Sequence, residues 1–308
     1  MADKLIIATR KSPLALWQAN FIKEQLLLKH DIEIELLKVV TQGDKLLDLP
    51  LSQIGGKSLF VKELESALLD GKADLAVHSL KDVAYEIPDS LAIATVCKRT
   101  IRADVLVSND NIPFNQLREG ATIGSSSLRR QAQLLNLRPD LNIVPLRGNV
   151  GTRLAKLKTE PIDAIVLAEA GLVRLGLEDT ITEHFNSDTF IPAAGQGALA
   201  IETRIDDIRT TSYLDFLNDP TTMAEVEAER AFVERLGAGC QAPIGASAKL
   251  VENNIIHLTG IVGSVDGKTI FKESLTFPHC DRFEKGRELA TRLLAKGADK
   301  IIDSLKVD

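Results

Sequence analysis

Short apolar runs alternate along this chain with longer stretches whose apolar residues recur at helical spacing. Residues 5–9 form one such run, and a helical pattern from 14 to 28 follows Ser12 and Pro13 directly. A serine before a proline in the first turn is a common helix start. The pattern therefore predicts a strand, a tight turn and a helix at the beginning of the chain.

The same alternation continues as far as residue 236. Further strands are predicted at 33–40, 75–78, 91–96, 104–107, 122–124, 142–145, 163–168 and 198–202. Further helices are predicted at 59–70, 128–137, 150–158 and 221–236. Strands that alternate with helices form βαβ units, so we expect an α/β fold with mixed, mostly parallel sheets.

Two interruptions and one change of pattern divide the chain. The alternation stops at 98–102 and again at the sequence FIPAAGQG of 190–197. From 247 to 277 the pattern changes to consecutive strands, which an amphipathic helix at 282–305 follows. The two crossings between the first two units would form a hinge. We expect two α/β domains and a small C-terminal α+β domain, with the boundaries 1–98 with 198–216, 102–192 and 220–308.

Composition excludes several classes of protein. The 308 residues carry 43 acidic and 37 basic side chains, and the net charge of −6 argues against nucleic acid or an anionic membrane as the main partner. The cysteines, Cys97, Cys240 and Cys280, lack the spacing of a zinc site, so no metal is expected. No apolar run is long enough for a signal peptide or a membrane span. We expect a soluble, cytoplasmic protein.

Positive charge is concentrated in residues 125–158. One acid, Asp140, stands there against seven bases: Arg129, Arg130, Arg138, Arg147, Arg153, Lys156 and Lys158. The sequences GSSSLRR and LRGNVGTR each follow a predicted strand and open a helix, where backbone N–H groups and the helix dipole attract anions. A solvated helix face would also explain a run of charge. Two such turns, both rich in arginine, favour a site for a polyanion.

Other polar residues also follow predicted strands. Arg10 and Ser12 lie on the first strand-to-helix turn, and Ser79, Lys81 and Asp82 follow the third strand. Ligands of open α/β sheets bind at the carboxyl ends of the strands. We therefore expect these residues to face one cleft.

Two further segments lead to expectations of a different kind. Residues 41–56 lack periodicity and precede Lys57, so this segment is a candidate lid. Trp17 and Phe21 lie four residues apart on the first predicted helix, and we expect them in the core.

Seven sequence blocks, in this order, resemble the porphobilinogen deaminase family. They are ATRKSPLALWQA at 8–19, GGKSLFVKELE at 55–65, HSLKDV at 78–83, GSSSLRR at 124–130, LRGNVGTRL at 146–154, PAAGQGAL at 192–199 and GAGCQAPIG at 237–245. Departures from the family pattern are small. Ala84 replaces a usual proline, Ser125 a usual threonine and Ser58 a common glycine, so no charged or nucleophilic group is lost.

The resemblance implies a three-domain fold whose first two domains are similar to periplasmic binding proteins. It implies a monomer that joins four porphobilinogen molecules head to tail into the linear tetrapyrrole hydroxymethylbilane and releases ammonia. It also implies a dipyrromethane cofactor, attached by a thioether to Cys240 of the GAGCQAPIG block. Uroporphyrinogen-III synthase is the implied partner for product transfer.

The resemblance also implies a role for each matched residue. Asp82 would be the catalytic acid/base group. The cofactor would be held by Lys81, Asp82, Ser125, Ser127, Arg129 and Arg130. Substrate would be bound by Arg10, Ser12, Lys57, Phe60, Ser79, Arg147, Arg153, Arg174 and Gln196. Each pyrrole unit carries an acetate and a propionate, which explains why an acidic protein concentrates arginines in this way.

The residues alone leave three other functions open. A two-lobed binder of a polyanion would need the arginines but neither Cys240 nor Asp82, whose carboxylate would then belong to a turn or pair with Lys81. A cysteine hydrolase would need a histidine beside Cys240, and a nucleic-acid binder is disfavoured by the net charge and the few aromatic residues. Cys97 and Cys280 are expected to be small buried hydrophobes. The intact mass separates these functions, because the deaminase alone carries two linked pyrrole units.

Overall fold

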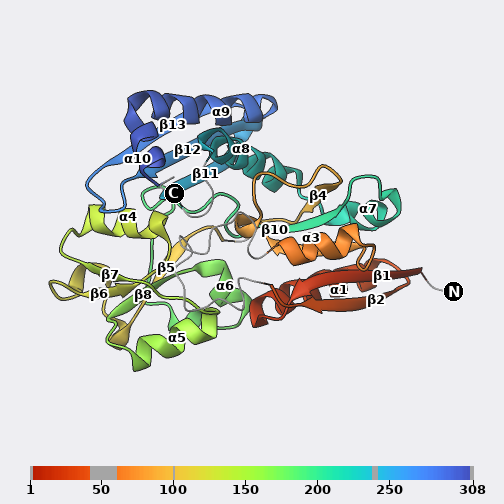
Figure 1. Ribbon diagram of the computed structural model, residues 1–308, viewed down its shortest axis with the longest axis horizontal. Coiled ribbons are helices and arrows are strands. Elements are labelled where there is room, and N and C mark those ends of the chain that lie inside the picture. The colour runs from red at the N-terminus through yellow and green to blue at the C-terminus, as the bar shows by residue number, and fades with distance from the viewer. Residues whose placement is uncertain (1–2, 42–60, 100, 238–241, 306–308) are drawn as a thin grey trace.

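The computed structural model describes residues 3–41, 61–99, 101–237 and 242–305 of the chain. Figure 1 shows two lobes side by side, with a third domain packed against both of them. The candidate lid at 41–56 lies, apart from Thr41, outside the described residues. No helix in the described segments is long and apolar enough to cross a membrane.

The first lobe is built on a five-stranded mixed sheet with the strand order β2–β1–β3–β10–β4. Its strands are β1 (Asp3–Arg10), β2 (Ile32–Val39), β3 (Leu75–Ser79), β4 (Leu91–Val96) and β10 (Leu199–Arg204). β1 runs parallel to β2 and β3, whereas β10 runs antiparallel to β3 and β4. The strand predicted at 198–202 therefore lies in the sheet formed by the N-terminal part of the chain.

Two helices cover opposite faces of this sheet, because successive residues of a strand point to opposite sides. α1 (Pro13–Lys29) packs against Leu5 and Ile7 of β1. α3 (Lys62–Leu69) packs against Ala8, the next residue along the same strand. α7 (Ile208–Leu214), which was not predicted, extends the α1 side through buried Leu214.

The second lobe repeats the plan of the first with the strand order β7–β6–β8–β5–β9. Its strands are β5 (Asp104–Ser108), β6 (Thr122–Gly124), β7 (Asn142–Val144), β8 (Ala164–Ala168) and β9 (Glu183–His184). β6 is parallel to β7 and β8, and β5 is antiparallel to β8 and β9. In both lobes an antiparallel strand is therefore inserted beside three parallel ones. In the first lobe this strand, β10, returns from a later part of the chain, whereas β5 of the second lobe directly precedes the other strands of its sheet.

Three helices belong to the second lobe. α4 (Leu128–Leu137) and α5 (Val150–Thr159) pack with different apolar clusters, one containing Leu106 and the other Val105 and Val107. Alternate residues of β5 thus face different helices, as in the first lobe. The predicted bounds of α4 are confirmed, whereas the short α6 (Glu169–Arg174) was not predicted.

Two chain segments cross between the lobes, one from β4 to β5 and one from β9 to β10. They meet at Gly197, which has a φ of +88°. A side chain at this position would collide with the carbonyl oxygen of Ile101 on the other crossing. Only glycine combines this backbone conformation with so close an approach.

The third domain is a three-stranded antiparallel sheet covered by helices. Its elements are α8 (Pro220–Leu236), β11 (Ile244–Val251), β12 (Ile255–Gly263), β13 (Ile270–Pro278), α9 (Arg282–Leu293) and α10 (Asp299–Ser304). The single helix predicted at 282–305 is wrong. The chain opens into a wider turn at 294–298, where Gly297 has a φ of +109° that favours glycine.

One buried carboxylate of the third domain binds both crossings. Glu229 of α8 accepts hydrogen bonds from Nη1 and Nη2 of Arg99, on the first crossing, at 2.9 and 3.0 Å. The backbone amide of Gly195, on the second crossing, donates to Glu229 at 2.7 Å. The amide of Ala248 on β11 donates to the same carboxylate at 2.9 Å. A single side chain therefore joins the third domain to both hinge segments.

Candidate functional site

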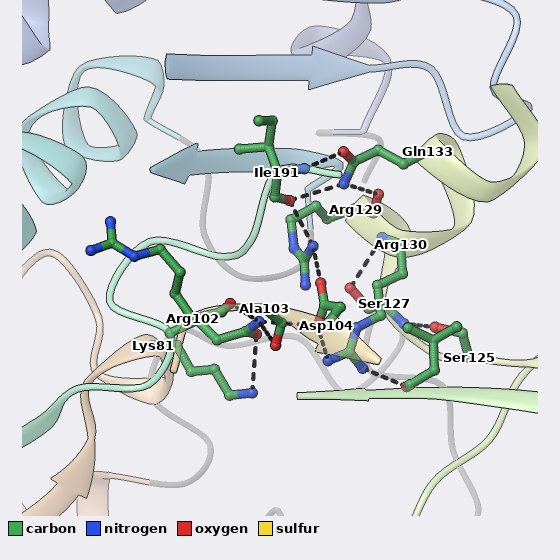
Figure 2. A network of polar contacts seen from close by, with 12 residues as sticks. Lys81, Arg102, Ala103, Asp104, Ser125, Ser127, Arg129, Arg130, Gln133 and Ile191 are labelled. Atoms are coloured by element: carbon green, nitrogen blue, oxygen red, sulfur yellow. Dashed lines mark hydrogen bonds and ion pairs between the residues drawn. The ribbon is translucent and has the colours of Figure 1, made fainter. Parts of the chain in front are cut away.

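Asp104, the first residue of β5, lies at the centre of a buried polar network. Arg129 Nη1 donates to its Oδ2 at 2.7 Å. Arg130 donates to its Oδ1 through Nε at 3.1 Å and through Nη2 at 2.7 Å. Figure 2 shows both guanidinium groups converging on this carboxylate from α4. Asp104 is 0% exposed, so the strand end carries a fully desolvated ionic cluster.

The charges in this cluster stabilise one another. Burial alone would raise the pKa of Asp104, but the two guanidinium groups outweigh burial and hold this pKa well below its usual range. Burial also lowers the pKa of Arg129, and the attraction of Asp104 opposes that shift. The Asp104 carboxylate therefore remains charged at neutral pH.

The local sequence explains why two arginines reach this point. Ser127 caps α4 by accepting a hydrogen bond from the Arg130 amide at 3.4 Å, which confirms the predicted helix start. Ser125 Oγ accepts from the amide of Ser127 at 3.3 Å. Because the arginines occupy the first turn of the capped helix, their side chains begin close to the end of the sheet.

Gln196 extends the network to the first lobe. Its Nε2 donates to Asp104 Oδ1 at 3.0 Å and to the carbonyl oxygen of Arg102 at 2.8 Å. Its Oε1 accepts a hydrogen bond from Lys81 Nζ at 3.4 Å. Lys81 follows β3 of the first lobe, so a chain of contacts runs from the end of that strand through Gln196 on the second crossing to Asp104 of β5.

Asp82 and Lys81 come from the same short turn that follows β3. Burial lowers the pKa of Lys81 to about 8, and the Asp82 carboxylate opposes this shift. Burial also lowers the pKa of Arg153 to about 10, and Asp82 opposes that shift too. Asp82 is therefore electrostatically close to a cation of each lobe. Its carboxylate forms no hydrogen bond or ion pair with another described residue, which argues against the simple pair with Lys81.

The remaining predicted site residues lie at the other strand-to-helix turns. Ser12 caps α1 through the Ala15 amide at 3.3 Å, as predicted, and Arg10 ends β1 beside it. Ser79 Oγ accepts a hydrogen bond from Gln18 of α1 at 2.7 Å.

On the second lobe, two of the predicted arginines lie around the start of α5. Arg153, in its second turn, donates from Nε to the carbonyl oxygen of Gly148 at 2.8 Å. Arg147 lies shortly before this helix, and partial burial lowers its pKa.

Arg174, at the end of α6, contacts both the second crossing and the first lobe. Its Nη2 donates to the carbonyl oxygen of Gly197 at 2.7 Å. Its guanidinium carbon lies 5.8 Å from the ring centre of Trp17 on α1. Burial lowers the pKa of Arg174 to about 10, which leaves it protonated at neutral pH.

The basic segment at 125–158 is not a single surface. Arg138 pairs with Asp140 at 2.6 Å, and Lys156 pairs with Glu160 at 3.6 Å. Local acids therefore neutralise these two bases, while Arg129 and Arg130 meet in the buried network. The count of charges along the sequence missed Asp104, because it lies 25 residues before Arg129 on another element. The signal was an acid at the first position of an otherwise apolar strand.

Two expectations about individual side chains are wrong. Trp17 is 37% exposed rather than part of the core; its ring stacks on Phe21 with 5.5 Å between ring centres, and Phe21 in turn packs against the core of the first lobe. Cys280 is exposed rather than buried, because it is the middle residue of the turn His279–Asp281 between β13 and α9. Cys97 is buried, as expected, and burial raises the pKa of its thiol to about 12.

Three of the predicted site residues, Lys57, Phe60 and Cys240, lie outside the described residues. Among the residues that are described, no group of histidine, cysteine, aspartate and glutamate side chains is arranged to hold a metal ion.

Comparison with known proteins shows what this chain is similar to. The profile of the porphobilinogen deaminase dipyromethane cofactor binding domain matches residues 5–212, and that of the porphobilinogen deaminase C-terminal domain matches 223–295. The porphobilinogen deaminase of Trichlorobacter lovleyi is 50% identical over 307 residues, which cover 99% of this chain and 98% of the relative. That of Geobacter sulfurreducens is 48% identical over 301 residues, covering 97% and 94%. A solved structure, the periplasmic VFT2 domain of Bordetella pertussis BvgS, is 16% identical with a TM-score of 0.39, covering 69% of this chain and 85% of its own.

Proposed function

The chain belongs to the porphobilinogen deaminase family, and we propose that Asp82 is the group that transfers protons in its active site. The enzyme condenses porphobilinogen head to tail into hydroxymethylbilane in tetrapyrrole biosynthesis, and it uses a dipyrromethane cofactor. Each condensation needs a proton donor for the departing amine and a base for the ring carbon that has reacted. One carboxylate can perform both tasks in turn.

The observation that carries this proposal is the electrostatic interaction of Asp82 with one cation from each lobe. Lys81 and Arg153 each interact electrostatically with its carboxylate. No described residue occupies the carboxylate oxygens, so they remain available to substrate. A fixed negative charge here would also stabilise the cationic pyrrole that forms during the reaction.

The donor set around Asp104 fits a dipyrromethane, whose acetate and propionate groups need cationic partners. Lys81, Ser125, Ser127, Arg129 and Arg130 would hold it. Arg129 uses Nη1 for Asp104 and for the carbonyl oxygen of Ile191, which leaves Nε and Nη2 without a partner among the described residues. Those two groups form the edge that binds a carboxylate through two hydrogen bonds. When bound, the cofactor supplies the pyrrole carbon to which the first substrate unit is joined.

Arg130 differs from Arg129 in this respect. Its Nε and Nη2 are both bound to Asp104, and its Nη1 donates to the carbonyl oxygen of Val166 at 2.9 Å. We therefore assign Arg129 the direct contact with a cofactor carboxylate. Arg130 would contribute charge and fix the position of Asp104.

We propose Cys240 as the attachment point of the cofactor. Thioether formation needs a thiolate, and a thiol with a raised pKa is a poor source of one. Burial raises the pKa of Cys97 to about 12, and a hydrogen bond to Asp281 raises that of Cys280. Cys240 follows the left-handed cap of α8 at Gly237 in a sequence of small residues, GAGCQ.

The other residues of the predicted site would bind substrate. Cations and hydroxyls at the strand ends suit the carboxylates of the incoming and growing pyrrole chain. They are Arg10, Ser12, Lys57, Ser79, Arg147, Arg153, Arg174 and Gln196, and Phe60 would stack on a pyrrole ring. Gln196 already contacts Lys81 and Asp104, so its contribution would be to orient them.

The organisation of the molecule completes the proposal. We propose the domain boundaries 1–98 with 198–216, 102–192 and 220–308, which follow the two crossings. The enzyme would act as a cytoplasmic monomer. Its product would pass to uroporphyrinogen-III synthase.

The attachment is tested by the intact mass of the purified protein. Wild type is expected to exceed its sequence mass by two linked pyrrole units. Cys240→Ser should be folded and show the sequence mass alone, whereas Cys280→Ser, the matched control, should keep the excess. A Cys240→Ser protein that still carries covalent pyrroles would contradict the assignment.

The role of Asp82 is tested in the enzyme that carries its cofactor. Asp82→Asn should keep the excess mass and lower kcat about 10²- to 10⁴-fold, the usual contribution of a proton-transfer group. Asp82→Glu should recover part of the rate, and Asp89→Asn, an exposed carboxylate nearby, should leave it unchanged. A kcat of Asp82→Asn close to that of wild type would remove this residue from the mechanism.

A further inference from the structure

The sole tryptophan of the chain lies where the two lobes meet. Trp17 belongs to α1 of the first lobe, and its ring stacks on Phe21 with an angle of 2° between the ring planes. The ring is nevertheless 37% exposed, which is unusual for so large an apolar side chain beside a helical partner. The indole therefore presents one aromatic face that does not pack on Phe21.

A cation of the second lobe lies over the indole ring. The guanidinium carbon of Arg174, on α6, is 5.8 Å from the ring centre of Trp17. This distance lies within the range of a cation–π interaction. α6 itself packs against the beginning of α1, since a side chain at Gly171 would lie 3.6 Å from Leu14 Cδ2. Figure 1 shows α6 beside α1 between the two lobes.

The second contact of Arg174 fixes the rotation of its guanidinium group. Nη2 donates to the carbonyl oxygen of Gly197 at 2.7 Å, on the crossing that returns to the first lobe. The backbone at Gly197 lies in close contact with that of Ile101 on the other crossing. Arg174 is therefore bound at one edge by the hinge and faces an aromatic ring.

A guanidinium group uses its face for an aromatic ring and its edges for carboxylates, so the two interactions do not compete. The contact with Trp17 leaves the edges of Arg174 free for further hydrogen bonds, apart from the one that Gly197 occupies. The contact with Trp17 also restricts the Arg174 side chain before a ligand binds, so binding costs less conformational entropy.

We propose that Trp17 is a positioning residue for Arg174, and that its exposed indole face orients the guanidinium to receive a substrate carboxylate. The inference rests on the substrate-binding role proposed above for Arg174. It adds a residue that the sequence suggested only as core. It also means that a substrate-binding arginine of the second lobe is oriented by a side chain of the first lobe.

The first experiment is a double-mutant cycle on KM for porphobilinogen, with the enzyme carrying its cofactor. Trp17→Leu should raise KM about 2- to 10-fold, the range expected for a cation–π contact, with little change in kcat. Trp17→Phe should restore most of the loss because it keeps an aromatic face. In the Arg174→Gln background, Trp17→Leu should have no further effect.

The outcomes separate the two proposals. If Arg174→Gln leaves KM unchanged, Arg174 does not bind substrate and the proposed substrate role fails. If Arg174→Gln raises KM but Trp17→Leu does not, or if the two effects add fully, Trp17 does not act through Arg174 and this inference is overturned. Arg209→Gln, which removes an exposed arginine from the first lobe, is the matched control and should change nothing.

A second readout does not depend on turnover. Because Trp17 is the sole tryptophan, all of the indole emission of the protein comes from this ring, and it responds to a change in the contact with Arg174. Arg174→Gln should change the emission of the substrate-free enzyme, whereas Arg209→Gln should not. Identical emission spectra of wild type and Arg174→Gln would contradict the proposed contact.

Discussion

The two lobes share one strand arrangement, yet the corresponding strands β10 and β5 bury carboxylates with different partners. Each lobe inserts one antiparallel strand beside three parallel strands, β10 in the first and β5 in the second. Each inserted strand carries a carboxylate that is 0% exposed, Glu202 on β10 and Asp104 on β5. The common scaffold therefore does not determine what these carboxylates do.

The partners of the two carboxylates make the difference. Asp104 accepts hydrogen bonds from Arg129, Arg130 and Gln196. Glu202 Oε2 contacts His78 Nε2 at 2.9 Å, and its Oε1 has no partner among the described residues. A buried charge is stable only when it is paired and hydrogen-bonded. Three side chains thus satisfy the buried carboxylate of the second lobe, whereas one side chain contacts that of the first lobe.

The largest effect is expected from Asp104→Asn. Removing this charge leaves two buried guanidinium groups without their common partner, which costs about 3–5 kcal/mol of unfolding free energy. Urea unfolding measures the loss. Asp140→Asn, which breaks the more exposed pair with Arg138, should cost far less unfolding free energy. Equal losses would contradict the larger contribution expected from the buried Asp104 network.

A smaller loss is expected from Glu202→Gln. The amide keeps the shape of the side chain and can still bond to His78, so the cost should be about 1–3 kcal/mol. The same urea titration applies. If Glu202→Gln lost more unfolding free energy than Asp104→Asn, the buried carboxylate of the first lobe would contribute more to stability than that of the second.

The helix caps should behave alike in the two lobes. Ser12 caps α1 and Ser127 caps α4, each at the turn that follows a strand. Ser12→Ala and Ser127→Ala should each cost about 1 kcal/mol. Thermal unfolding of both variants checks this, and a clear difference in stability would show that one serine has a larger structural role than capping.

A pH dependence is expected from Lys81, which keeps some solvent contact. Burial lowers its pKa from 10.5 to about 8, so the unfolded state binds more protons between these values. The free energy of unfolding should therefore gain a contribution as the pH rises through this window. The free energy of unfolding of Lys81→Met should exceed that of wild type below pH 8, and this difference should disappear toward pH 10.5. A difference between the two proteins that does not change with pH would contradict the lowered pKa.

Local signals predicted much of the fold and part of the site. The serine cap and the apolar spacing of 128–137 were sufficient to place α4, because a capped amphipathic helix is specified by near neighbours. The break at Gly297 was missed, since the amphipathic pattern continues through it. Asp104 and the exposed ring of Trp17 were missed because their partners are distant in sequence and belong to other elements.

The carboxylate of Glu229 has a mechanical consequence. It holds Arg99 of one crossing, Gly195 of the other and Ala248 of β11 at once. Bending at the crossings would therefore displace α8 together with them. Leu236, the last residue of α8, precedes Cys240 by only a few positions. A rotation of one lobe against the other would therefore also displace the cofactor that we propose is attached at Cys240.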